Sequence, residues 1–230
     1  MKKHLKIAFG LLLMLIMALT VFTLGADPLT GLTLCGAVPV TFADLEFTDG
    51  EDNAAGTQLL AYYILAEDIA TLPGYKTDPS NLADYATIDQ AFVCKAGKKF
   101  NKLYATPDTG KIDDNKIEGK DSNAYESIYE YFFPKNDKSI LGFMRLSGTG
   151  KFIVIVLEAD GNKRVLGIKP GVPAILASVA ATSGNNSGGD KGATFQFKSW
   201  QNGPAPVYTA DIPIGGDPSE STSSSAKPLF

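Results

Sequence analysis

Histidine is almost absent from this 230-residue sequence, in which His4 is the only one. Most hydrolases that use a serine or cysteine nucleophile need a histidine to move protons during the reaction. A histidine so close to the start of the chain, far from any candidate core, does not suit that role. We therefore predict no catalytic residues and a protein that is not an enzyme.

Cysteine is also scarce, with Cys35 and Cys94 as the only two. They lack Cys-x-x-Cys spacing and have no histidine nearby, which argues against a zinc site. They could pair if the domain is exported, or remain buried thiols if it is not. The acidic loop 49–53 lacks the residue order of a calcium loop, and residues 96–99 lack the phosphate-loop pattern. We predict neither a metal nor a cofactor.

The charged residues form no concentrated patch. The formal net charge is −4 and no basic stripe is present, so we predict no nucleic-acid sequence readout. Asp113 and Asp114 are adjacent, and neighbours in a strand point to opposite faces, so they should not converge. Asp84 and Asp89 flank a long loop without a predicted acid–base partner. A glycosidase could combine two distant carboxylates, but the sequence indicates no such pair.

One long hydrophobic run is present, at residues 7–24. It contains no charge and follows a start in which three of the first six residues are lysine. Eighteen residues is near the lower limit for a membrane span, and a basic start with an apolar run also describes a signal peptide. We predict that residues 1–26 are a signal or membrane-anchor segment, either cleaved near Ala26 or retained. The remaining alternative is that this segment is neither a signal nor an anchor. We also leave open a contact with a membrane through residues 7–24.

The rest of the chain is typical of a β-rich fold with many turns. It is rich in glycine, proline, phenylalanine and tyrosine. We predict a mainly β domain over residues 37–214, an antiparallel β-sandwich or barrel with one short helix. A polar, serine-rich tail at 215–230 is predicted to be disordered.

A β-hairpin at residues 151–168 is predicted to lie at the centre of this domain. Phe152 to Leu157 is apolar on both faces, which predicts a strand covered on both sides. Asp160-Gly161 favours a hairpin turn, and Gly167 indicates a bulge or a close backbone approach. A buried parallel strand or a short buried helix is the alternative for this run.

The remaining pattern predicts further strands and one helix. The strands are expected at 37–47 (an extended edge segment), 59–66, 88–93, 100–105, 125–133, 174–180, 193–200 and 207–214 (a final edge segment), with a hairpin loop at 182–192. For the stretch 59–70 a helix is the alternative, because its alanines, Glu67 and Asp68 suit one. The helix is expected at 137–146, with Asp137 as its N-cap. Ile140, Leu141, Met144 and, less well, Phe143 are expected on the face that covers the sheet. Tyr125, Tyr129 and Tyr131 could form a sugar-stacking face or pack in the core.

The second half of the chain resembles virion structural proteins of tailed phages that infect Bacteroidetes-type hosts. The resemblance runs from about Gly97 to Ile214. It is carried by FNKLYATPDTG, DSNAYES, KSILGFMRL, ADGNKRVLGI, GVPAIL, ATSGNNSGGDKGATFQF and PAPVYTADIP. It implies a tail-tube-like β subunit that pairs its sheets with neighbouring copies into rings, located in the virion. The implied partners are copies of itself, in a symmetric homo-oligomer, and other particle proteins.

The hydrophobic run at 7–24 departs from that resemblance, because a tail-tube subunit needs no export signal. It favours an alternative function: an exported or membrane-anchored binding module that recognises a glycan or a protein partner. In that case the C-terminal domain would lie outside the cytoplasm.

Overall fold

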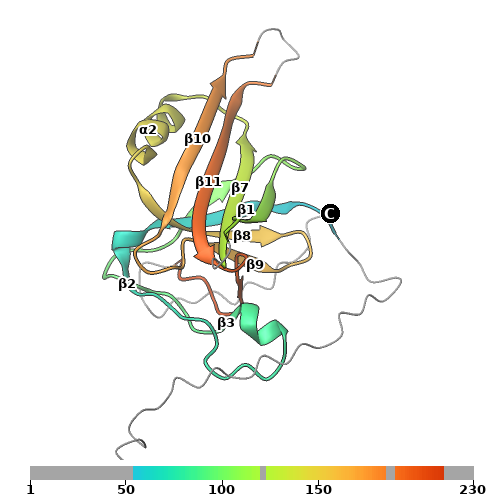
Figure 1. Cartoon of the computed structure of the whole chain (residues 1–230). Coiled ribbons are helices and arrows are strands. Elements are labelled where there is room, and N and C mark those ends of the chain that lie inside the picture. The colour runs from blue at the N-terminus through green and yellow to red at the C-terminus, as the bar shows by residue number, and fades with distance from the viewer. Residues whose placement is uncertain (1–53, 120–122, 185–189, 215–230) are drawn as a thin grey trace, which may run out of the picture. The chain divides into compact units, whose positions relative to one another are not determined.

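The computed structural model describes residues 54–119, 123–184 and 190–214. Within these ranges the chain is mainly β with one α-helix, and a curled mixed sheet forms a half-barrel (Figure 1). The predicted fold class is therefore confirmed. The predicted segments 1–26, 37–47 and 215–230 lie outside the described residues.

Strand β8 (Lys151–Glu158) is the centre of the sheet. It forms the predicted antiparallel hairpin with β9 (Lys163–Leu166) and pairs along its other edge with β1 (Thr57–Leu65). At its start it also pairs with β10 (Ala174–Thr182), through the Ala174–Phe152 and Ile175–Lys151 positions. The central hairpin was thus predicted correctly.

The side chains of β8 divide between two hydrophobic cores. Phe152, Val154 and Val156 belong to the first core, whereas Ile153 and Ile155 belong to the second. All five are at most 3% exposed. Because successive strand residues point to opposite faces, a strand that serves two cores must be apolar at every position.

The half-barrel continues from β10 through antiparallel pairs. β10 pairs with β11 (Gly192–Asn202), β11 with β7 (Ala124–Phe133), and β7 with β6 (Lys111–Lys116). The chain between β5 (Asn101–Tyr104) and β6 turns a corner, so that β5 pairs with β1 instead. β1, β5, β7, β10 and β11 agree with the five strands predicted at 59–66, 100–105, 125–133, 174–180 and 193–200.

Two of the predicted strands were wrong in detail. The stretch 88–93 splits into β3 (Thr87–Ile88) and β4 (Val93–Cys94). Between them, Phe92 turns into the second core and its backbone N–H donates to the Tyr208 hydroxyl at 3.2 Å. The segment 207–214 contains only β12 (Val207–Tyr208), which lies between β9 and β3 and is therefore not an edge.

The smaller elements complete the described part. β2 (Ile69–Thr71) and β4 form a separate two-stranded sheet. Short 3₁₀ turns occur at Ala66–Asp68 and Ala83–Ala86. β12 and β3 run parallel, which makes the large sheet mixed.

Helix α2 (Lys138–Ser147) covers the first core, close to the predicted position. Ile140, Phe143 and Met144 pack against the core, and the Phe143 ring lies 5.7 Å from that of Phe195. The assignment of Leu141 to this face was wrong, since it is 50% exposed. One residue beyond Ile140 is about 100° further around the helix, which places Leu141 outside the contact stripe.

Asp137 caps this helix, as predicted, because its side chain accepts hydrogen bonds from the backbone N–H groups of Ser139 and Ile140, both at 3.1 Å. We expect Asp137→Ala to lower the free energy of unfolding by about 1 kcal/mol, the usual contribution of an N-cap. Asp137→Ser should retain most of the stability because serine also caps. Urea denaturation of the two variants measures the difference, and equal losses would contradict the capping role.

Candidate assembly surface

Arg164 on β9 joins three separate segments of the chain. Its guanidinium donates to the Asp114 carboxylate on β6, to Glu158 Oε1 at 3.1 Å and to the Ala205 carbonyl at 2.6 Å. The side chains of all three charged residues are less than 20% exposed. This cluster therefore ties β6 and the segment before β12 to the central hairpin.

Asp114 is fully engaged by its neighbours. Besides Arg164, it accepts from the Ser127 hydroxyl and from the Ala205 backbone N–H at 3.0 Å. Asp113 instead forms an ion pair with Lys111 at 3.2 Å. The expectation that the adjacent carboxylates do not converge is confirmed, and the geometry of Asp114 is that of a structural acceptor.

Glu158 in this cluster has a raised pKa. Burial is the largest cause, and the nearby Asp160 and Asp114 add to it, while Arg164 acts in the opposite direction. A raised carboxyl pKa can mark a general acid. Here Arg164 holds both Glu158 and Asp114, and the pockets described below are lined by other residues.

Asp84 has partners that the sequence did not reveal. It accepts from Lys76 Nζ at 2.9 Å and from the Ser80 backbone N–H at 2.8 Å. The hydrogen bond from Lys76, followed by those from Ser80, lowers the pKa of this half-buried carboxyl. Asp84 therefore stays ionised and fastens the long loop that precedes β3.

Tyr129 and Tyr131 are core residues. They are 0% and 1% exposed, and the Tyr131 ring stacks on Phe195 with centroids 5.3 Å apart. The core alternative is correct for these two, and a sugar-stacking face built on them is excluded. Tyr125 is half-buried and pairs in register with Gln201.

The described residues contain little else that could carry chemistry. Among them, no group of three metal-ligating side chains occurs, and no helix is long and apolar enough to cross a membrane. Cys94 is a half-buried free thiol, and Cys35 lies outside the described ranges.

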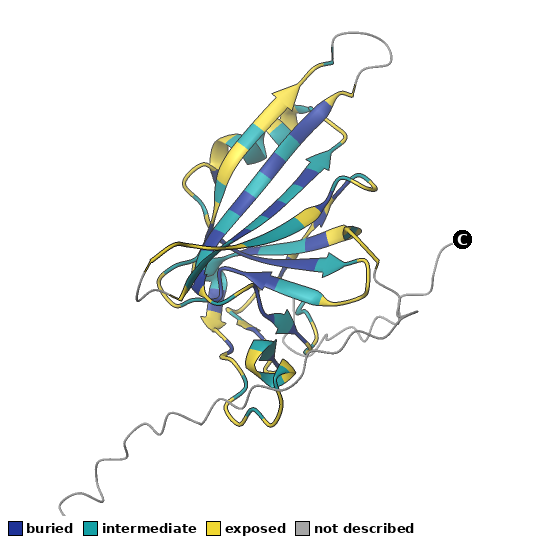
Figure 2. Ribbon diagram, turned by 45° about the vertical axis from the view of Figure 1, so that its right-hand side comes forward, coloured by how far each residue is buried: buried dark blue, intermediate teal, exposed yellow. Residues whose placement is uncertain are grey.

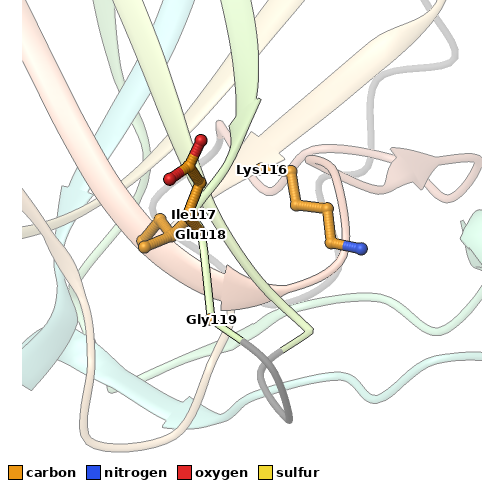
Figure 3. A pocket seen from close by; sticks show the side chains of 4 residues that line it. All are labelled: Lys116, Ile117, Glu118 and Gly119. Carbon is orange, nitrogen blue, oxygen red and sulfur yellow. The ribbon is translucent and has the colours of Figure 1, made fainter.

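A hollow of about 560 Å³ lies at the end of β6 (Figure 3). Its lining residues, Lys116, Ile117, Glu118 and Gly119, are consecutive. Figure 3 shows the Lys116 and Glu118 side chains pointing away from each other. Because a binding site needs polar groups that converge, this hollow does not qualify as one.

Two further pockets lie among the described residues, each lined by several elements. One of about 600 Å³ lies between β1, the β8–β9 hairpin and the last described residues, Asp211 to Ile214. Another of about 240 Å³ lies between α2 and β1, where the rings of Tyr63, Phe143 and Phe152 line it. In the second, Asp68 is already paired with Lys98 at 3.0 Å.

The feature that stands out is the free edge of β10. β8 pairs with this strand only at Ala174 and Ile175, and β11 occupies its other edge. Among the described residues, no strand pairs with the outer edge from Leu176 to Thr182. Figure 2 shows this strand as largely exposed beside the buried stripe of β11.

The other sheet edges are protected, but β10 is not. β6 carries two lysines and two aspartates in six residues, and β3 and β5 are only two and four residues long. Charge and shortness both discourage an edge from pairing with another chain. β10, AILASVAAT, is nine residues long and contains no charge and no proline.

The sequence analysis identified this strand but missed its edge. Its lack of charge was visible in the sequence, whereas the absence of a neighbour depends on where β8 begins, at Lys151. No protein-family model, curated protein or solved structure matches the chain.

Proposed function

We propose that this protein is a non-enzymatic structural subunit that assembles with copies of itself. The free β10 edge carries the proposal, because unpaired backbone N–H and C=O groups on a long uncharged strand form a template for strand addition. The engaged carboxylates of Asp114 and Asp84 support a non-catalytic role.

The particle we propose is a phage virion or tail. The support is the resemblance of residues 97–214 to tail-tube-like subunits, together with a curled β domain that has one uncharged open edge. In such a particle the partners are further copies of this chain and other particle proteins.

The alternative function is an exported or membrane-anchored binding module. The uncharged run at 7–24 favours it, and the pocket of about 600 Å³ beside Ile214 would then be the place for a glycan or peptide. This alternative predicts a monomer or dimer that binds a ligand, whereas the proposed function predicts a larger symmetric assembly.

A lysine on the β10 edge tests the proposed function. Ala180 is exposed and lies opposite Thr194, so Ala180→Lys adds a charge to the edge without disturbing a core. We expect the purified wild-type protein to form oligomers in light scattering, and Ala180→Lys to shift it strongly toward the monomer. Thr77→Lys, at an exposed loop position, adds the same charge and should leave the assembly intact.

Two results would contradict the proposal. A wild-type protein that stays monomeric at high concentration would contradict the proposed self-assembly. Equal behaviour of Ala180→Lys and Thr77→Lys would show that β10 is not the contact.

A further inference from the structure

We propose that the pocket of about 600 Å³ beside the second core binds a small amphipathic carboxylate, a free alkyl chain that ends in one carboxyl group. The pocket is lined from β1, β5, the β8–β9 hairpin and the last described residues, and none of its lining residues belongs to β10. The inference therefore goes beyond the proposed function and does not depend on assembly.

The second core continues toward solvent along β1 and β8. On β1, the residues that face this core run from the buried Ile64 through the half-buried Tyr62 to the exposed Leu60. On β8 they run from the buried Ile155 to the half-buried Leu157. Because alternate strand residues share a face, the face that packs the core also lines the pocket. One wall of the pocket is therefore apolar.

The facing wall is the segment 210–214, which hydrogen bonds fasten to two strands. At its start, the Ala210 carbonyl accepts from Lys163 Nζ on β9 at 2.7 Å. Near its end, the Pro213 carbonyl accepts from the Phe100 backbone N–H, next to β5, at 3.0 Å. The apolar side chains that this segment contributes to the pocket are Ile212 and Ile214. The pocket thus lies between two apolar walls of fixed position.

Two lysines of the lining have no carboxylate partner within the described ranges. Lys102 lies opposite Tyr62 across the β5–β1 pair, and Lys163 begins β9. Neither ammonium takes part in an ion pair of the described part of the chain. Lys163 instead donates to the carbonyl named above and lies 5.6 Å from the centre of the Tyr208 ring. Asp211 is the one carboxylate of the lining, so positive charge is in excess there.

This combination selects the chemistry of the ligand. Small-molecule sites are commonly apolar hollows of several hundred Å³ with a few polar groups that converge. Apolar walls favour an alkyl chain because they remove it from water, and an ammonium binds a carboxylate through charge-assisted hydrogen bonds. Tyr62 supplies the single aromatic ring of the lining, which favours an alkyl chain over the flat face of a sugar.

The first test compares three ligands that share one chain and differ in the charge of the head group. Octanoate, octan-1-ol and octylammonium are titrated into the full-length protein at neutral pH, and isothermal titration calorimetry measures the affinities. We expect octanoate to bind about tenfold more tightly than octan-1-ol, and octylammonium to bind most weakly. Raising the salt concentration should reduce the advantage of octanoate, since ions screen the lysines.

The second test locates the head group and the chain. Lys102→Met keeps the apolar stem and removes the charge, so it should weaken octanoate about fivefold or more and leave octan-1-ol unchanged. Lys99→Met removes the same charge from an exposed position outside the pocket and should change neither affinity. Leu60→Ala should weaken octanoate and octan-1-ol alike, whereas Leu141→Ala, at an exposed position on α2, should weaken neither.

Several results would overturn the inference. Equal affinities for octanoate and octan-1-ol would show that the lysines do not select the head group, and an absence of binding would show that there is no site. Equal losses in Lys102→Met and Lys99→Met, or in Leu60→Ala and Leu141→Ala, would place the binding elsewhere. A monomeric wild-type protein that shows the expected pattern would contradict the proposed self-assembly and confirm the pocket.

Discussion

Gly167→Ala should lower the free energy of unfolding by about 2–5 kcal/mol, the largest effect we expect from a single methyl group. Gly167 has φ +85°, which alanine adopts only with strain. A Cβ at this position would lie 2.5 Å from the Ala174 backbone nitrogen and 2.6 Å from the Phe152 carbonyl oxygen. Both atoms belong to the β8–β10 junction, so neither can move aside without breaking it.

Gly171→Ala provides the matched control. Gly171 also has a positive φ, +77°, but a Cβ there would meet no atom within 4 Å. Gly171→Ala should therefore lower the free energy of unfolding only by the cost of placing alanine at a positive φ, about 1–2 kcal/mol. Urea denaturation of both variants isolates the contribution of the close contact, and similar losses would show that the junction is not tightly packed at Gly167.

Asp114→Asn should destabilise the protein by about 2–4 kcal/mol. Asp114 only accepts hydrogen bonds, from Arg164, Ser127 and Ala205. In asparagine an NH₂ group replaces one of the two accepting oxygens, so it would face a group that itself donates. The substitution would also leave the half-buried Arg164 with Glu158 as its only charged partner. Thermal and urea unfolding at neutral pH measure this loss.

Glu158→Gln is the contrasting change in the same cluster. Glutamine keeps an oxygen for Arg164, so the loss at neutral pH should stay below about 1 kcal/mol or become a gain. Burial raises the pKa of Glu158 in the folded protein. The folded state therefore binds the proton more tightly, and this contribution to stability is present at low pH and is lost as pH rises through the folded pKa.

The glutamine variant has no such proton to lose. The stability of Glu158→Gln relative to wild type should therefore increase between about pH 4 and pH 7. Unfolding curves at both pH values test the sign. A relative stability that decreases over this range would mean that the attraction of Arg164 outweighs the burial of Glu158.

Local signals made a large part of the fold predictable. The apolar run of β8 and the Asp160-Gly161 turn specify a hairpin within a few residues, and Asp137 marks the start of α2. Such signals depend on neighbours in the sequence, which is why pattern alone identified them.

Contacts between distant segments could not be predicted in the same way. Arg164 and Asp114 are 50 positions apart, and Phe92 leaves its expected strand because Tyr208, 116 positions away, accepts its N–H. The open edge of β10 is another such case. It exists because β8 begins only at Lys151, opposite Ile175, and no local pattern in β10 records where a neighbouring strand begins.

The position of β8 between two cores also bears on how the domain unfolds. A strand that contributes alternate side chains to both cores couples them mechanically, because neither core can open while β8 keeps its place in the other. The two cores should melt in one cooperative transition, and the amides of Ile153 to Val156 should exchange with solvent only when the whole domain opens. In the assembly that we propose, each copy would therefore keep a rigid centre, and adjustment between copies would fall to the strand edges.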